Sequence, residues 1–316
     1  MRRTFFIVGP TATGKSELSA DVAREIGAEI VSVDAFQIYR GLDLLTAKPD
    51  ASTLGKAPHH LIGTTPLHEE MNAEKYRRAA SRAIEEVHSR GKLAIVVGGS
   101  GLYIKALTHG LAPMPESDQK LREKLNAMSL EKLQAQLAEL DPEAAQKIDL
   151  KNRRRVVRAL EICLLVGKPA SEVVAGVADP DKSVKARPQS APAASGVFVF
   201  RDREKLYARI NQRVEAMFEN GVIEEVQAAA KVSSTASQMI GFREIHELLD
   251  GTMSVLQCIA AIQQATRRYA KRQLTWFRRQ TNFSPLNLSL LTHNEAMILL
   301  RMLLERRKIS RVRAKG

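Results

Sequence analysis

The residues best suited to chemistry stand near the start of the 316-residue chain, between Gly9 and Ser16. The run has the G-x-x-x-x-G-K-S spacing of a phosphate-binding P-loop. Its two glycines let consecutive N–H groups turn inward, and the helix that follows adds the positive end of its dipole. We expect eight residues to bind a diphosphate or triphosphate: Gly9, Pro10, Thr11, Ala12, Thr13, Gly14, Lys15 and Ser16.

Two side chains of this run have distinct expected roles. Lys15 would neutralise the outermost phosphate, and the hydroxyl of Ser16 would be a ligand of Mg²⁺, the expected cofactor. The alternative is a glycine-rich turn without a ligand. An apolar strand at 4–8 and a helical pattern on the other side disfavour that alternative, since a P-loop requires both.

The first third of the chain alternates between strand and helix patterns that would position these residues. Strands are predicted at 4–8, 28–33 and 93–97, and an amphipathic helix at 76–90. This order predicts a doubly wound parallel sheet, which binds ligands at the carboxyl ends of its strands. The second strand ends in Asp34, a candidate general base or metal neighbour, although an Asp there is also a common turn residue.

The rest of the chain divides into further segments. The first part of the core covers 1–115, and an all-helical insertion covers 116–190. A strand at 197–200 indicates that the sheet resumes, so the second part of the core covers 191–290, with helices at 202–227, 243–249 and 255–280. Residues 291–316 form a basic C-terminal tail, and we expect its Lys/Arg-rich end, residues 306–313, to be disordered. The predicted fold class is therefore α/β: a P-loop core with an inserted helical domain and a helical C-terminal part.

Charge and composition narrow the function. The chain carries 48 Lys and Arg against 35 Asp and Glu, and the stretch 265–280 holds six basic residues and no acid. Such runs are typical of nucleic-acid binding, although a solvated surface is the alternative. Cys163 and Cys258 both lie in apolar helical runs, which predicts buried thiols and excludes structural zinc. Without a signal peptide or membrane-length apolar stretch, we expect a soluble, cytoplasmic protein.

Eight motifs together resemble the bacterial tRNA dimethylallyltransferase family, also called tRNA isopentenyltransferases. The P-loop is common to many enzymes, whereas the Asp-x-x-Gln-x-Tyr and Lys-Arg-Gln-x-Thr-Trp-x-Arg motifs are more specific. The matching segments, in order, are GPTATGKS (9–16), SVDAFQIYRGLD (32–43), TAKP (46–49), PHHLI (58–62), VVGGSGLYIKAL (96–107), RVVRALE (155–161), QMIGFRE (238–244) and TRRYAKRQLTWFRR (266–279).

The resemblance implies transfer of the dimethylallyl group of dimethylallyl diphosphate to N6 of the adenosine on the 3′ side of the anticodon, with release of diphosphate. It implies catalytic roles for Lys15, Asp34 and Ser100: Lys15 stabilises the leaving group, Asp34 accepts a proton from the amine, and Ser100 holds diphosphate or Asp34. Gln37 matches a residue that recognises the target base.

The implied partners are the anticodon stem-loop of tRNA and dimethylallyl diphosphate. No membrane and no obligate protein partner are implied, so a monomer is expected, with the insertion 116–190 binding the stem-loop. Trp276 is expected to pack in the core. The residues implied to contact tRNA are Asp34, Ala35, Phe36, Gln37, Ser100, Arg122, Arg154, Arg155, Arg158, Gln238, Gly241, Arg243, Lys271, Arg272, Thr275 and Arg278.

Three positions depart from the family pattern. Ala35 replaces the Ser that usually follows the catalytic Asp, and Leu45 replaces the Gly that usually precedes Thr-Ala-Lys-Pro. Gly63 stands where an Asp often follows the Pro-His-His motif. Two rival functions share Lys15 and Asp34: a small-molecule kinase that binds ATP, and a transferase that prenylates free AMP, ADP or ATP. A non-catalytic RNA-binding protein would need neither residue.

Overall fold

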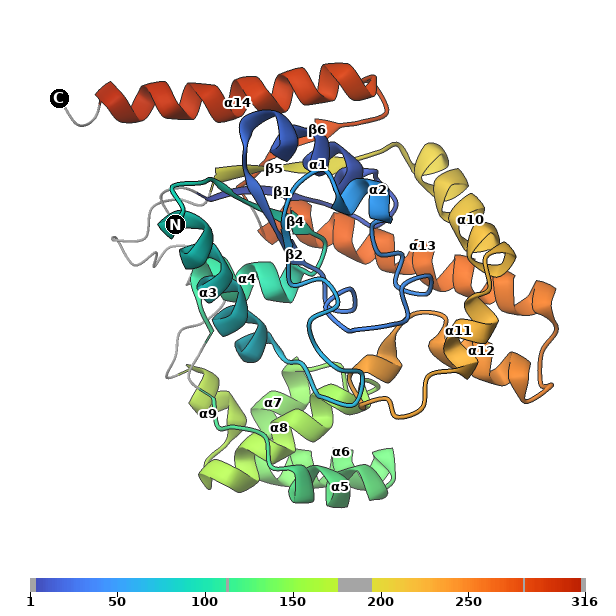
Figure 1. Cartoon of the computed structure of the whole chain (residues 1–316). Helices are drawn as coiled ribbons and strands as arrows, with labels where there is room; N and C mark the ends of the chain where they lie inside the picture. Colours follow the sequence, from blue (N-terminus) through green and yellow to red (C-terminus); the bar gives the residue numbers. More distant parts are fainter. Residues whose placement is uncertain (1–3, 112–113, 176–194, 281, 314–316) are drawn as a thin grey trace. The chain divides into compact units, whose positions relative to one another are not determined.

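A computed structural model of the protein describes residues 4–111, 114–175, 195–280 and 282–313. Six strands form one parallel sheet in the order β3-β2-β4-β1-β5-β6 (Figure 1). This confirms the predicted α/β fold with a doubly wound sheet. The two edge strands were not predicted, because one has only two residues and the other contains a proline. The strands are β1 Thr4–Val8, β2 Glu29–Val33, β3 His59–His60, β4 Ala94–Gly98, β5 Ser195–Phe200 and β6 Ser284–Asn287.

Successive residues of the strands point to opposite faces of the sheet, and each face has its own core. Phe5 and Ile7 of β1 face α1 (Lys15–Ile26) and α14 (His293–Arg313). Phe6 and Val8 face the opposite core, beneath the other helices. Those helices are α3 Ala73–Ser89, α4 Gly101–His109, α10 Arg203–Glu219, α11 Val222–Gln227, α12 Phe242–Leu249 and α13 Val255–Gln280, and a short α2 spans Ala51–Leu54.

The chain divides into two compact units, Met1–Gly110 with Pro192–Gly316, and Leu111–Ala191. The second unit contains the helices expected for the insertion, and its core is built by leucines and valines such as Leu133, Leu137 and Val156. A stretch rich in Pro, Ala and Ser at 178–195 lies outside the described residues except for Ser195. The helices of this unit are α5 Gln119–Ala127, α6 Leu130–Leu140, α7 Pro142–Lys147, α8 Arg153–Val166 and α9 Ala170–Ala175.

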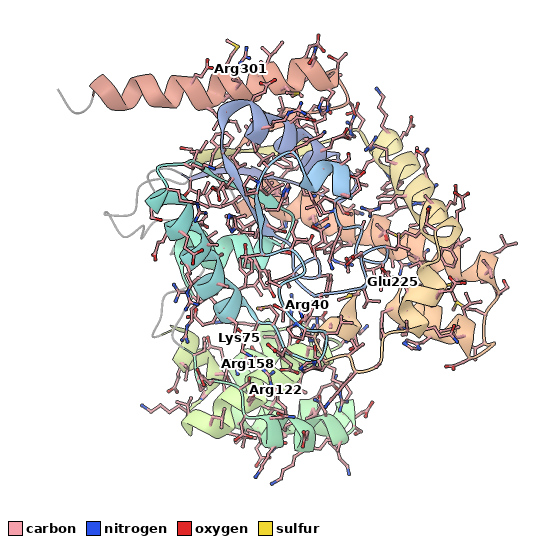
Figure 2. The ribbon with its side chains drawn as sticks, in the orientation of Figure 1. Arg40, Lys75, Arg122, Arg158, Glu225 and Arg301 are labelled. Carbon is pink, nitrogen blue, oxygen red and sulfur yellow. The ribbon has the colours of Figure 1, made fainter. Side chains whose placement is uncertain are left out.

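The expectation that the Lys/Arg-rich end of the tail is disordered is wrong, because that end belongs to a helix. Helix α14 runs from His293 to Arg313 and buries four residues on the α1 face of the sheet: Ala296, Met297, Leu300 and Leu304. Arg301 adds a long ion pair from its Nη1 to Glu25 Oε2 at 3.8 Å (Figure 2). The excess of positive charge in this segment drew attention away from its apolar residues, which recur at helical spacing. Burial of these residues against the sheet stabilises α14.

Both cysteines are buried and free, as predicted. In the described part of the chain, the longest helices are too polar to cross a bilayer.

A buried carboxylate fixes the start of β2. Glu29 accepts hydrogen bonds from Arg90 Nη2 at 2.6 Å and His60 Nε2 at 2.7 Å, and Lys92 Nζ lies 3.2 Å away. These bonds, that of Arg90 first, lower the pKa of Glu29 to about 2 although burial acts in the other direction. The carboxylate therefore ties β2 to β3 and to the chain between α3 and β4.

We expect Glu29→Gln to lower the free energy of unfolding by about 1–3 kcal/mol at pH 7, because three donors lose a charged acceptor. The folded pKa lies below the unfolded value of about 4.3, so this stability is complete above pH 4.3 and disappears as pH falls toward 2. Urea titrations at several pH values measure it. Glu74→Gln, at an exposed pair of arginines, is the control and should cost less than about 1 kcal/mol.

Candidate active site

The parallel register brings the chemically interesting residues to one edge of the sheet. Val8, at the end of β1, pairs with Gly98 of β4 and Phe198 of β5, while Val33 of β2 pairs with Gly98. The P-loop, Asp34, Ser100 and Arg201 each follow one of these strands, so they share the carboxyl edge.

The P-loop has the conformation that its sequence predicts. Gly14 is the N-cap of α1 in the left-handed region at φ 90°, where a side chain would be strained. Thr13 Oγ1 and Lys15 Nζ both donate to the Pro10 carbonyl at 3.1 Å, which curls the loop around the helix terminus. Burial lowers the pKa of Lys15 to about 8, with the Asp34 carboxylate opposing that shift and Arg213 adding to it.

Three arginines that the sequence motifs did not reveal surround this loop. Arg201 Nε donates to the Thr13 carbonyl at 2.8 Å, Arg209 Nε to the Ala12 carbonyl at 2.9 Å, and Arg213 Nη1 to Thr11 Oγ1 at 3.0 Å. Burial lowers the pKa of Arg213 to about 10. Its Nε is buried without a hydrogen-bond partner in the described part of the chain, which marks a donor available to a ligand.

The carboxylate of Asp34 both shapes a turn and faces open space. Its Oδ1 accepts from the N–H groups of Phe36 at 3.0 Å and Gln37 at 3.2 Å, so the simple turn role is real. Asp34 also lines two cavities. Ser100 Oγ accepts from the Ala35 N–H at 2.8 Å and so joins the β4 end to this turn.

Two side chains of α13 reach the same edge, those of the buried Gln273 and the half-buried Tyr269. Gln273 accepts from the Thr11 N–H at 2.9 Å and donates to the Gly99 carbonyl at 3.0 Å, which ties the helix to the P-loop. Tyr269 lies one turn earlier. Its burial, with the charge of Asp34, raises its pKa, although contacts with Ser100 and Gln273 act the other way. Neither residue was predicted as part of the site.

Two cavities meet at Asp34. The first, of about 430 Å³, is lined by the P-loop, Arg209, Arg213 and polar residues such as Asp43 and Lys48. The second, of about 60 Å³, is mostly apolar. The residues that line both are Thr11, Asp34, Thr46, Ala47, Arg213 and Met217. The arrangement suits a ligand with an anionic head and a small apolar tail.

Comparisons with known proteins agree with this geometry. The model of the IPP transferase family matches residues 37–280. The chain belongs to the IPP transferase family. It is 41% identical to the tRNA dimethylallyltransferase of Akkermansia muciniphila over 277 residues, 88% of this chain and 90% of that protein. It is 42% identical to the enzyme of that name from Geobacter sulfurreducens over 281 residues, 86% of this chain and 88% of that protein.

Solved structures of similar proteins extend the match to the whole fold. The tRNA isopentenylpyrophosphate transferase of Bacillus halodurans is 30% identical, with a TM-score of 0.70 over 100% of this chain and 99% of that one. A eukaryotic dimethylallyltransferase, described as acting on tRNA, is 26% identical with a TM-score of 0.70, covering 90% of this chain and 74% of the other.

Other predicted RNA contacts of this IPP transferase lie on α13, on α12 and in the segment just before α12. Lys271, Arg272, Thr275 and Arg278 are exposed, whereas Trp276 is partly buried against the core, as expected. Gln238 and Arg243 are also exposed, and Arg243 pairs with Glu244 Oε1 at 3.1 Å. Gly241, in contrast, is buried in this structure, so the predicted contact of this residue with RNA is not accessible here.

The arginines of the helical unit divide into two groups. Arg122 and Arg158 both bind the fully buried Glu161, with Arg122 Nε 2.9 Å from its Oε1 (Figure 2). Each is about one-third exposed, so part of each guanidinium could still meet a phosphate. Arg154 and Arg155 are exposed. The RNA contacts predicted for these four arginines stay predictions.

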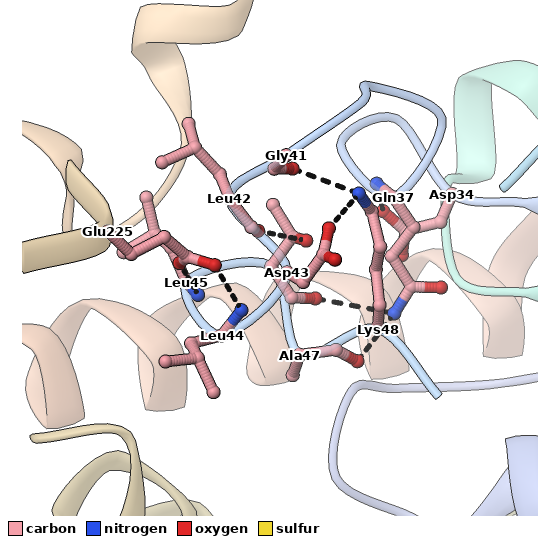
Figure 3. A network of polar contacts seen from close by, with 11 residues as sticks. Asp34, Gln37, Gly41, Leu42, Asp43, Leu44, Leu45, Ala47, Lys48 and Glu225 are labelled. Carbon is pink, nitrogen blue, oxygen red and sulfur yellow. Dashed lines mark hydrogen bonds and ion pairs between the residues drawn. The ribbon is translucent and has the colours of Figure 1, made fainter. Parts of the chain in front are cut away.

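Gln37 has a role that its predicted base recognition did not include. Its Nε2 donates to the Ala47 carbonyl at 2.8 Å and the Thr46 carbonyl at 3.3 Å (Figure 3). Both N–H groups of the amide are thereby used within the loop 40–49. Only the carbonyl oxygen of Gln37 is left to accept a hydrogen bond from a base.

Proposed function

We propose that this protein is a tRNA dimethylallyltransferase, which moves the dimethylallyl group of dimethylallyl diphosphate to N6 of the adenosine 3′ to the anticodon. The observation that carries the proposal is the pair of cavities joined at Asp34. One offers Lys15, Arg209 and Arg213 to an anion, and the other offers an apolar pocket. A hydrophobic tail attached to a diphosphate fits this division.

The cations around the P-loop would stabilise the leaving group. As the C–O bond of the allylic ester breaks, its electron pair passes to the diphosphate oxygen, where negative charge grows. Lys15 is half-buried at the first cavity, and the Nε of Arg213, which has no partner among the described residues, is buried, so their charges act in a poorly solvated setting. Such interactions strengthen from ground state to transition state and so accelerate the reaction.

Asp34 would complete the transfer. The lone pair of N6 forms the new bond to the allylic carbon, and the carboxylate of Asp34 accepts the proton that the amine loses. Asp34 lines both cavities, so it lies where the tail would join the diphosphate. Ser100 holds the turn that contains Asp34 in place, because its hydroxyl oxygen accepts a hydrogen bond from the Ala35 N–H.

Magnesium is part of the proposal. Within the described residues there is no cluster of three or more His, Cys, Asp or Glu side chains suited to a metal ion. The first cavity nevertheless has hard oxygen donors in Ser16 and Asp43. This set fits Mg²⁺, which commonly combines few protein ligands with substrate phosphates. When bound, the ion would neutralise charge on the diphosphate, and Ser16 would hold it.

The RNA partner is proposed to be the anticodon stem-loop, bound by one monomer in the cytoplasm. We expect Lys271→Ala with Arg278→Ala to weaken RNA binding and to flatten its log–log salt dependence by about 0.7–0.9 for each phosphate that is no longer neutralised. Fluorescence titrations over a salt series measure this. Arg78→Ala with Arg301→Ala removes the same charge from α3 and α14 and should leave the slope unchanged. An unchanged slope in the first variant would contradict the predicted RNA contact.

The pKa of Lys15 makes diphosphate binding pH-dependent. In the protein without ligand, the ammonium group of Lys15 has a pKa of about 8 and loses its charge as pH rises through 8. The KM for dimethylallyl diphosphate should therefore rise over this range of pH. Lys15→Arg, whose guanidinium stays charged, should move this rise above pH 9 even if its kcat is lower. Steady-state kinetics between pH 6.5 and 9.5 test it. Identical pH profiles would show that Lys15 is not the titrating group.

The deciding experiment incubates an anticodon stem-loop with the protein, Mg²⁺ and dimethylallyl diphosphate, followed by nucleoside mass spectrometry. The expected result is one dimethylallyl group on the adenosine 3′ to the anticodon. ATP should be neither consumed nor required, which separates the proposal from a kinase. AMP offered in place of RNA should give no product, which separates it from a transferase of free nucleotides.

A further inference from the structure

The loop 40–49, between β2 and α2, has a strained conformation that contacts within and outside the loop hold in place. Gly41, Leu42 and Ala47 have φ values of 75°, 52° and 49°. Left-handed backbone is uncommon for residues with side chains and is strained where it occurs. The loop lines both cavities through Thr46 and Ala47. Hydrogen bonds within the loop, such as that from the Thr46 N–H to the Leu42 carbonyl at 3.1 Å, hold part of this conformation, and contacts from outside the loop hold the rest.

Glu225 of α11 is the main outside contact. Its Oε1 accepts from the Leu44 N–H and its Oε2 from the Leu45 N–H, both at 2.9 Å (Figure 3). A carboxylate that accepts hydrogen bonds from two consecutive N–H groups forms strong, charge-assisted interactions. Gln37 holds the other end of the loop through the Ala47 carbonyl. The backbone of Leu45 is therefore held in place by the hydrogen bond from its N–H group to Glu225.

The side chain of Leu45 forms part of the wall of the apolar cavity. It is only 6% exposed and lines that cavity with Phe36, Met239 and Ile262. Space for it exists because Gly241 has no Cβ: one placed there would lie 2.8 Å from Leu45 Cδ1. The cavity that remains measures about 60 Å³. Leu45 is also one of the positions where the chain departs from the family pattern.

We propose that Leu45, held in position by Glu225, is a specificity-determining residue that limits the allylic tail to five carbons. The inference rests on the proposed function. A ten-carbon tail, as in geranyl diphosphate, needs about twice the apolar volume, and the Leu45 side chain occupies the space into which it would extend. Removing three carbon atoms from the wall lengthens the cavity toward Gly241.

The test compares kcat/KM for dimethylallyl diphosphate and geranyl diphosphate, with the stem-loop as acceptor. The protein as it stands should prefer the five-carbon substrate by on the order of 10²-fold, and Leu45→Ala should reduce that preference at least tenfold. Leu45→Met conserves volume and should keep the original preference. Leu44→Ala, at the neighbouring position, should keep it too, since Leu44 lines only the first cavity.

Three results would overturn the proposal. The first is a native protein that uses both diphosphates equally, which needs no variant and so decides the matter even if Leu45→Ala does not fold. The second is a folded Leu45→Ala with an unchanged preference. The third is a change confined to the KM for RNA, which would assign the cavity to the base. Absence of any transfer from dimethylallyl diphosphate by the native protein would instead contradict the proposed function.

The positioning role of Glu225 has its own readout. Glu225→Ala should lower the preference for the five-carbon tail, because Leu45 loses its anchor. Formate should restore the preference in part by occupying the two N–H groups. Glu224→Ala, which removes a carboxylate from the same helix, is the control and should neither lose the preference nor respond to formate. Loss of stability without a change in preference would make Glu225 a structural residue only.

Discussion

Asp34→Asn is expected to lower the rate of the chemical step by about 10²–10⁴, the usual contribution of a general base. The substitution keeps the oxygen that accepts from the Phe36 and Gln37 N–H groups, so the turn should persist. What it removes is the capacity to take the amine proton. Single-turnover transfer to the stem-loop at saturating dimethylallyl diphosphate isolates this step from binding.

The same preparation provides the controls for Asp34→Asn. RNA affinity should be unchanged, and inorganic diphosphate should still bind at pH 7, because the cations around the P-loop remain. Asp34→Ala, which also loses the turn, should be slower still or less stable. Near-native single-turnover rates in the Asn variant would show that Asp34 serves the turn alone and that the proton leaves by another route.

The sequence predicted best what depends on neighbouring residues. The strand Thr4–Val8 and the helix Val255–Gln280 have the predicted bounds, because apolar periodicity is local. The convergence of the P-loop, Asp34 and Ser100 at one edge followed from their positions after parallel strands. Their catalytic roles stay predictions, since geometry alone does not test them.

What the sequence could not supply was long-range pairing. Arg209 and Arg213 belong to α10, and only the pairing of β5 beside β1 brings that helix to the P-loop. A usable signal existed, because both arginines lie on one helical face after the strand that returns the chain to the sheet. The ordering of α14 depends likewise on a surface offered by α1, at the opposite end of the chain.

Arg213→Met should lower kcat/KM for dimethylallyl diphosphate by about 10²–10³, the usual cost of losing one donor to a developing oxyanion. Its Nε is buried without a hydrogen-bond partner among the residues that the structure describes, and its Nη1 donates to the Thr11 hydroxyl, so both the charge offered to a ligand and the geometry of the loop depend on it. Methionine fills much of the same space without charge. Steady-state kinetics divide the effect: a fall in kcat marks stabilisation of the transition state, and a rise in KM alone marks uniform binding.

Arg203→Met is the matched control, because Arg203 lies on the same helix but is exposed over the ring of Tyr207, 5.2 Å from its centroid. It should change kcat/KM by only a small factor. Affinity for the stem-loop should be equal in both variants, since the first cavity is proposed to hold diphosphate and not RNA. If Arg213→Met impaired RNA binding and left the use of dimethylallyl diphosphate intact, the arginine would face the nucleic acid. The cationic side chains lining the anion site would then be Lys15 and Arg209.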